Sequence, residues 1–206
     1  MPRVDDPWHR KLENAVLDHM NALEGRTIAM PYHAVLDKDD KECLMYCESI
    51  GAHVVRTRPD RITILPNGTV IKWDAKTCKW PTGKDFSIEA LPFLLACAES
   101  ILFEVHYLFC CVRHDGQSYG IWAGLESLQM VQRLLIPLPA HKDDWKEWER
   151  IFDNYFDVFG ISNVTVATTS QGNKDPFVCL WVDDGTTATW QKTIDLFMEE
   201  QNSATP

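Results

Sequence analysis

Hydrophobic and polar residues alternate along residues 61–76 as half-buried β-strands require. Two runs rich in β-branched residues, 62–64 and 69–71, flank the triplet Pro66-Asn67-Gly68. Because Asn-Gly favours the positive φ values of tight turns, the pattern predicts a β-hairpin. A further strand is expected over 53–58, directly before Pro59.

The predicted hairpin brings two carboxylates together. If its loop is 66–68, Leu65 pairs with Thr69, and Asp60 then faces Asp74; a two-residue loop shifts this pairing by one position. Directly opposed residues have Cβ atoms roughly 4.5–5.5 Å apart. Strand alternation then gives one face the charged side chains Lys72, Asp74 and Lys76, and the other face Ile71, Trp73 and Ala75.

Two neighbouring carboxylates repel each other unless a cation lies between them. A hard divalent ion with oxygen ligands, most simply Mg²⁺ (or Mn²⁺), suits Asp60 and Asp74. Lys76, on the same face, could orient a water nucleophile or stabilise the charge of a pentavalent phosphate. The alternative is a surface hairpin with a solvated Asp–Lys pair.

Pro59-Asp60, thirteen further residues and Asp74-Ala75-Lys76 together resemble the PD-(D/E)XK nuclease superfamily, which includes restriction endonucleases and archaeal-type Holliday junction resolvases. The resemblance covers about residues 40 to 125. It implies an α/β, restriction-endonuclease-like core with a central mixed sheet flanked by helices. It also implies that Asp60 and Asp74 bind the metal and that Lys76 is catalytic.

The superfamily usually adds a glutamate from a helix ahead of these strands. The apolar stripe of 39–50 predicts such a helix, ending at Gly51. Glu42 has the expected side chain and is our candidate for this catalytic and metal-binding carboxylate. Asp40 lies better in phase with the stripe, and Glu48 and Glu13 are weaker candidates.

Periodicity predicts the remaining elements. Helices are expected over 8–24, 87–103 (with Ser87 as N-cap), 125–136, 145–159 and 186–200, and strands over 105–113, 119–123, 163–169 and 177–182. The expected core order is therefore αβββαββ. We expect an N-terminal helix and linker (1–38), a nuclease-like core (39–138) and a C-terminal α/β extension of unknown role (139–206).

Composition describes a globular chain of 206 residues with 45% hydrophobic side chains and a net charge of −10. Residues 53–84 carry seven basic and two acidic side chains, a net charge of +5, whereas 141–206 carry five basic and twelve acidic ones, a net charge of −7. A basic island inside an acidic protein suits a substrate that carries phosphates. The expected nucleic-acid contacts are Arg56, Arg58, Lys72, Lys79 and Lys84. Trp80 either contacts a sugar-phosphate backbone or base, or packs within its own loop.

Seven cysteines without a CxxC pair indicate buried free thiols in a reducing compartment, and no apolar run approaches the ~18 residues of a membrane span. The charged first residues are unlike a secretion signal, so a cytoplasmic protein is expected.

We therefore expect a metal-dependent endodeoxyribonuclease. Branched DNA is the first choice of substrate, and a restriction or repair role is close behind. The main rival is a nuclease-fold binding module without turnover, and an acidic DNA mimic is a weaker one. A homodimer, and a protein partner for the acidic segment, are left open.

Overall fold

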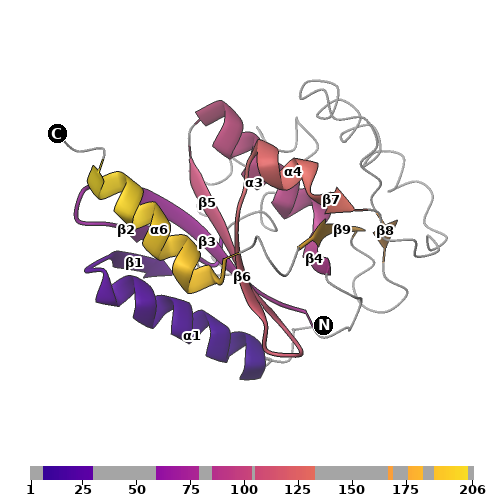
Figure 1. Cartoon of the computed structure of the whole chain (residues 1–206), viewed down its shortest axis with the longest axis horizontal. Coiled ribbons are helices and arrows are strands. Elements are labelled where there is room, and N and C mark those ends of the chain that lie inside the picture. Colours follow the sequence, from indigo (N-terminus) through magenta and orange to yellow (C-terminus); the bar gives the residue numbers. More distant parts are fainter. Residues whose placement is uncertain are drawn as a thin grey trace, which may run out of the picture.

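The computed structural model describes residues 7–29, 59–78, 85–103, 105–132, 167–168, 176–182 and 188–203. Its centre is a five-stranded mixed sheet whose strands lie in the order β1 (Arg26–Ala29), β2 (Arg61–Ile64), β3 (Val70–Cys78), β5 (His106–Arg113) and β6 (Ser118–Trp122). Helices α1 (Pro7–Ala22), α3 (Ala90–Phe103) and α6 (Trp190–Ser203) flank this sheet (Figure 1). The predicted α/β class with a central mixed sheet is confirmed.

The β2–β3 hairpin has the predicted register. Ile64 lies opposite Val70 and Arg61 opposite Trp73, and the strands are antiparallel. The backbone N–H of Leu65 donates to the carbonyl of Thr69 at 2.9 Å, which closes a loop over 66–68. Gly68 supplies the positive φ of 86° that this loop needs and that glycine adopts without steric cost.

The strand that pairs with the outer side of the β2–β3 hairpin comes from the N-terminal part of the chain. Helix α1 buries Leu12, Val16 and Met20, as predicted, and β1 then pairs with β2 on the side away from β3. The described chain thus supplies a helix and a strand in the places that the sequence assigned to 39–50 and 53–58. Those two segments lie outside the described residues.

Helix α3 lies between β3 and β5 in the sequence. In the sheet, β5 is the direct neighbour of β3 and pairs with it in parallel. A turn with Gly116 at φ 84° then returns the chain into β6, antiparallel to β5. This strand and its hairpin partner agree with the predicted 105–113 and 119–123. Parallel neighbours need a crossover connection, and α3 belongs to that connection.

The two faces of the central sheet bury different clusters. The α1 face carries Ile71, Trp73, Ala75, Leu108 and Cys110, which pack with side chains of α1 and α6. The α3 face carries Lys72, Asp74, Lys76, Tyr107 and Phe109, of which Tyr107 and Phe109 pack with α3 and with a second, smaller sheet. The predicted division of β3 into a charged face and an apolar face is confirmed, since Ile71, Trp73 and Ala75 are fully buried.

The second sheet contains β4 (Asp85–Glu89), β9 (Pro176–Trp181) and β7 (Val131–Gln132), with β8 (Ala167–Thr168) also paired to β9. The predicted helix start at Ser87 is wrong, because Ser87 lies in β4 opposite Cys179. Phe86 and Ile88 alternate with polar neighbours and are buried, which is a strand pattern.

The predicted helix over 125–136 is also wrong in extent. Helix α4 (Leu125–Gln129) ends after five residues, and the chain then pairs Val131 with Leu180. The segment 145–159 and the expected boundary between 138 and 139 lie outside the described residues, so the domain division stays a prediction. Strand β9 and helix α6 correspond to the predicted 177–182 and 186–200.

Buried polar groups on the α1 face are paired. The indole N–H of Trp73 donates to Oγ1 of Thr63 at 2.9 Å, and that oxygen lies 2.9 Å from Oγ1 of Thr27. The five described cysteines are buried free thiols, as predicted. Within the described part of the chain, none of the helices has the length and apolarity that crossing a membrane requires.

Strand β6 and helix α6 approach each other closely at Gly120. A Cβ built there would lie 2.5 Å from both Cβ and Oγ1 of Thr193 on α6. We expect Gly120→Ala to lower the free energy of unfolding by about 1–3 kcal/mol, the usual cost of overpacking. The measurement is urea unfolding followed by circular dichroism.

The matched control is Gly124→Ala, because a Cβ there would meet only Oγ of Ser100, at 3.8 Å. This variant should be close to wild type. Equal stability of the two variants would contradict the close approach of β6 and α6.

Candidate functional site

Asp60 and Asp74 are joined by two hydrogen bonds just beyond the last paired residues of β2 and β3. The backbone N–H of Asp60 donates to Oδ1 of Asp74 at 2.8 Å. In return, the backbone N–H of Ala75 donates to Oδ2 of Asp60 at 2.9 Å. Each carboxylate therefore binds the backbone of the other segment, and the two charges are held side by side.

The carboxylate of Asp74 is deeply buried, with 3% of its side chain exposed. Its Oδ2 accepts a hydrogen bond from the hydroxyl of Tyr107 at 2.7 Å. The ammonium nitrogen of Lys76 lies 3.7 Å from the same oxygen. Burial, followed by the charge of Asp74, raises the pKa of Tyr107 well above its ordinary value, so this hydroxyl keeps its proton and donates.

Asp60 lies nearer to solvent, with 21% of its side chain exposed. Burial, followed by the negative charge of Asp74, raises the pKa of Asp60 from 3.8 to about 7. The charge of Lys76 and the N–H of Ala75 act in the opposite direction and do not cancel the rise. A perturbed carboxyl of this kind is typical of functional sites, although structural networks produce it too.

Helix α1 contributes two side chains next to Asp60, one turn apart. Nε2 of His9 lies 4.0 Å from Oδ2 of Asp60. Oε1 of Glu13 accepts from Nε of Arg61 at 2.8 Å and lies 2.7 Å from its Nη2. The charge of Glu13 also contributes to the raised pKa of Asp60. Glu13, which the sequence ranks as a weak candidate, is thus the described helix glutamate that acts on the aspartate pair.

The donor set fits a hard divalent cation. Burial, followed by repulsion from Asp74, raises the pKa of Asp60, and a positive charge between the two carboxylates would relieve that repulsion. Mg²⁺ is commonly held by one or two carboxylates with water and phosphate oxygens completing its shell. Among the described residues, no group of three His, Cys, Asp or Glu side chains gathers at one point, so Asp60 and Asp74 are the described ligands available.

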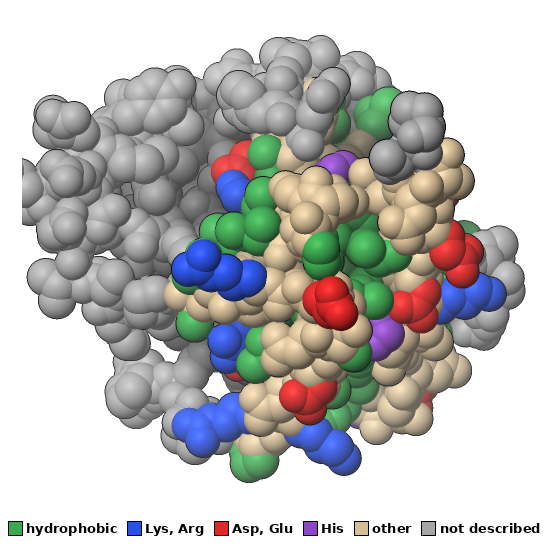
Figure 2. All heavy atoms as spheres, turned by 90° about the vertical axis from the view of Figure 1, so that its left-hand side faces the viewer, with side chains coloured by type: hydrophobic (Ala, Val, Ile, Leu, Met, Phe, Trp, Pro, Cys, Tyr) green, Lys and Arg blue, Asp and Glu red, His purple; other side chains and the backbone are tan. Residues whose placement is uncertain are grey.

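The described cations of the basic island each contact a carboxylate. Lys72 binds Glu99 of α3 at 2.8 Å, Arg61 binds Glu13, and Lys76 lies beside Asp74. Figure 2 shows both acidic and basic side chains on the described part of the face that it presents. The positive charge expected from the sequence is therefore locally compensated at these three residues.

Several predicted site residues lie outside the described part of the chain. They are Glu42, Asp40, Glu48, Arg56, Arg58, Lys79, Lys84 and Trp80. Their roles stay predictions. His9 and Tyr107 were not singled out from the sequence. The spacing of His9 and Glu13 on one helix is a signal that could have been used, whereas Tyr107 carries none.

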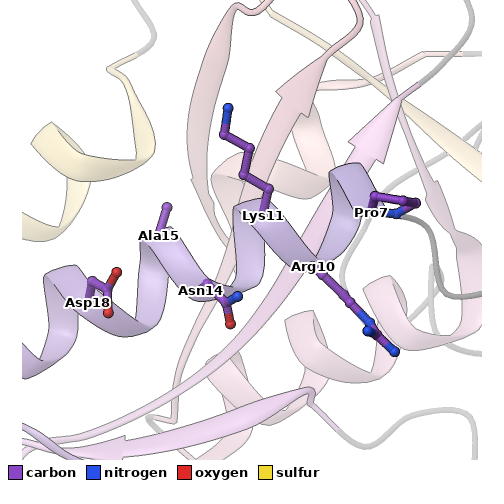
Figure 3. Close-up of a pocket in the computed structure, with 6 residues that line it drawn as sticks. All are labelled: Pro7, Arg10, Lys11, Asn14, Ala15 and Asp18. Atoms are coloured by element: carbon purple, nitrogen blue, oxygen red, sulfur yellow. The ribbon is translucent and has the colours of Figure 1, made fainter.

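The outer side of α1 borders a pocket of about 550 Å³ (Figure 3). The described residues that line it are Pro7, Arg10, Lys11, Asn14, Ala15 and Asp18, all from this helix. This lining mixes both charge signs and includes none of the aspartate pair or Lys76. The pocket is therefore a feature separate from the candidate site.

The raised pKa of Asp60 predicts a pH-dependent stability. A carboxyl with a folded-state pKa above its unfolded value stabilises the fold fully below pH 3.8, and this contribution is lost as the pH rises through about 7. Asn at this position keeps an oxygen for the N–H of Ala75 but never ionises. We expect Asp60→Asn, free of divalent ions, to be more stable than wild type at pH 8 by the order of 2 kcal/mol, with no gain near pH 3.5.

Thermal unfolding at the two pH values is the measurement. Asp18→Asn, which removes an exposed carboxylate of α1, is the matched control and should gain nothing at either pH. A gain of equal size at both pH values would show that ionisation of Asp60 is not the cause.

Comparisons with known proteins add little to this geometry. No protein-family model matches the chain, and no curated protein matches it. Among solved structures, it is similar to Hjc, a Holliday junction resolvase from the archaeal hyperthermophile Archaeoglobus fulgidus. The likeness covers 61% of this chain and 77% of that one, with 12% sequence identity and a TM-score of 0.36. A likeness at this level carries no argument about function.

Proposed function

We propose that this protein is a divalent-metal-dependent phosphodiesterase that cuts DNA, with Asp60, Asp74 and Lys76 as its active site. The observation that supports this most is that each aspartate carboxylate accepts a hydrogen bond from the backbone of the other segment, from Asp60 and Ala75, with the lysine 3.7 Å from Asp74. Such an arrangement holds two like charges together at an energetic cost. A site that binds a divalent cation explains why the cost is tolerated.

Asp60 and Asp74 would hold Mg²⁺ (or Mn²⁺) through their carboxylate oxygens. When bound, the cation would lower the pKa of a coordinated water and offset charge on the phosphate. The ammonium of Lys76 stabilises the additional negative charge that develops on the phosphate oxygens. Tyr107 and the N–H of Asp60 keep the carboxylate of Asp74 in one orientation.

Two glutamates are candidates for the helix carboxylate that completes the metal site. Glu42 remains our proposal from the sequence resemblance. Glu13 is the alternative that the described geometry favours, because its charge acts on Asp60 and because α1 precedes β1 in the described sheet. Its ion pair with Arg61 fixes it in place, and this pair would have to open or share its oxygen for Glu13 to bind metal.

Branched DNA is the proposed first-choice substrate, by the resemblance of the sequence motif to small resolvases; restriction or repair is the next choice. Arg56, Arg58, Lys79 and Lys84 are the proposed phosphate contacts. Lys72 is a weaker contact than the sequence suggested, since Glu99 already binds it.

One observation favours a second function. Asp74 is almost fully buried, and both of its oxygens already accept hydrogen bonds. A carboxylate of this kind is also what a purely structural polar network contains. The rival proposal is therefore a binding module with this fold and without turnover, acting through protein or nucleic-acid contacts.

Asp74→Asn decides between these proposals. It removes one metal-binding charge at nearly constant volume. We therefore expect cleavage of four-way-junction and linear DNA in Mg²⁺ or Mn²⁺ to fall about 10²- to 10³-fold, the usual cost of removing one main electrostatic contributor. Gel assays at saturating protein, with EDTA as the blank, measure it. Circular dichroism checks that the variant is folded.

Undiminished Mg²⁺-dependent cleavage by folded Asp74→Asn would exclude this site. Absence of any cleavage by the wild-type protein, with retained DNA affinity in Ca²⁺, would support the binding module instead.

The variants Glu13→Gln and Glu42→Gln distinguish the two candidates for the helix carboxylate. Turnover should fall about tenfold or more in the variant that removes the metal-binding glutamate, and it should change little in the other variant. Single-turnover cleavage at saturating Mn²⁺ is the measurement. Glu13→Gln also leaves Arg61 without its carboxylate, so Arg61→Gln is the control: if it reproduces the loss, the ion pair and not metal binding explains the effect.

A further inference from the structure

Tyr107 occupies a position that connects the aspartate pair to the core of the sheet. It lies on β5 beside Lys72 in the parallel register, and its hydroxyl reaches Oδ2 of Asp74 at 2.7 Å. The residue is 2% exposed, and its ring packs on Phe109 with centroids 5.1 Å apart. The hydroxyl is therefore fixed by the core and not by solvent.

Two donors from different strands approach the same oxygen of Asp74. The Tyr107 hydroxyl makes the hydrogen bond, whereas Nζ of Lys76 stays at 3.7 Å, beyond normal hydrogen-bond length. A buried carboxylate oxygen that loses its donor takes the nearest replacement, because an unsatisfied buried charge is costly. In the absence of the hydroxyl, we expect the lysine ammonium, 3.7 Å from this oxygen, to move onto it.

A lysine bound tightly to Oδ2 would oppose a divalent cation at the same carboxylate. It would add a positive charge against the ion and take up an oxygen that the ion needs. Groups that orient a metal-binding side chain typically change metal affinity by 10–100-fold when they are removed.

We propose that Tyr107 is a positioning residue for the metal site: its hydroxyl holds Asp74 in place and keeps the ammonium of Lys76 from closing on Oδ2, so that Asp74 can bind a divalent cation together with Asp60. This inference rests on the proposed function, because it assumes that the aspartate pair binds metal. It adds a residue that the sequence motif does not contain.

The test is the dissociation constant for Mn²⁺, measured without substrate by calorimetry or by the spin-resonance signal of free Mn²⁺. Tyr107→Phe removes only the hydroxyl, and we expect Mn²⁺ binding to weaken about tenfold. The matched control is Tyr119→Phe, which removes the hydroxyl of another buried tyrosine in the same cluster and should stay within about twofold of wild type. All titrations are done well below the unfolding temperature of each variant.

A double-mutant cycle isolates the part played by Lys76. In the Lys76→Met background, Tyr107→Phe should cost less than about threefold, because the ammonium that would close on Oδ2 is gone. An equal loss in both backgrounds would overturn the proposal, and so would unchanged Mn²⁺ affinity in Tyr107→Phe alone.

Two further results complete the test. If Tyr107→Phe does not fold, Lys76→Met alone decides: affinity equal to or tighter than wild type supports the proposal, and weaker binding overturns it. If wild-type protein binds no Mn²⁺, the proposed function fails together with this inference, whereas Mn²⁺ binding that Tyr107→Phe leaves unchanged defeats the inference alone.

Discussion

The pairing of Asp60 with the backbone of the neighbouring strand, and of Asp74 with the backbone of Asp60, is the constraint on which the site depends. Backbone N–H groups at fixed positions satisfy two carboxylates that would otherwise move apart. This geometry exists only if β2 and β3 keep their register, since a slip of one residue would turn Asp74 to the opposite face. The apolar side of the hairpin enforces that register, because Trp73 and Ile71 are fully buried beneath α1 and α6.

The two aspartates differ in their surroundings. Asp74 is buried and is held by Tyr107, whereas Asp60 lies just before β2, near α1 and nearer to solvent. Burial, followed by the charge of Asp74, raises the pKa of Asp60 to about 7, although Asp60 is the residue closer to solvent. The pair therefore combines an inner carboxylate held by fixed hydrogen bonds with an outer carboxyl whose charge changes near neutral pH.

Local sequence signals predicted the part of the site that lies within one hairpin. Asn67-Gly68 and the alternation of 69–76 determine the register, and with it the position of Asp60 relative to Asp74. Contacts that cross long stretches of sequence were not predictable in this way. Tyr107 sits in an apolar run that reads only as a buried strand, and the choice of β1 as the neighbour of β2 depends on α1 packing below the sheet.

Strand β4 was mistaken for the start of a helix for the same reason. Its short run of five residues gains its partner from β9, about ninety residues later, and an isolated strand of this length has weak local preference. Ser87 is a good helix cap by residue type, but pairing with Cys179 and burial of Phe86 and Ile88 outweigh that preference.

The position of the last two described elements has a consequence for biosynthesis. Strand β9 lies between β4 and β7 in the second sheet, and α6 covers the sheet face that contains Trp73. A nascent chain that has emerged from the ribosome only as far as β6 therefore has its central strands with α1 and α3, but it lacks α6 on one face and β9 on the other. The aspartate pair can form its hydrogen bonds early, whereas the apolar surface that α6 and β9 cover stays exposed until both segments have emerged and docked.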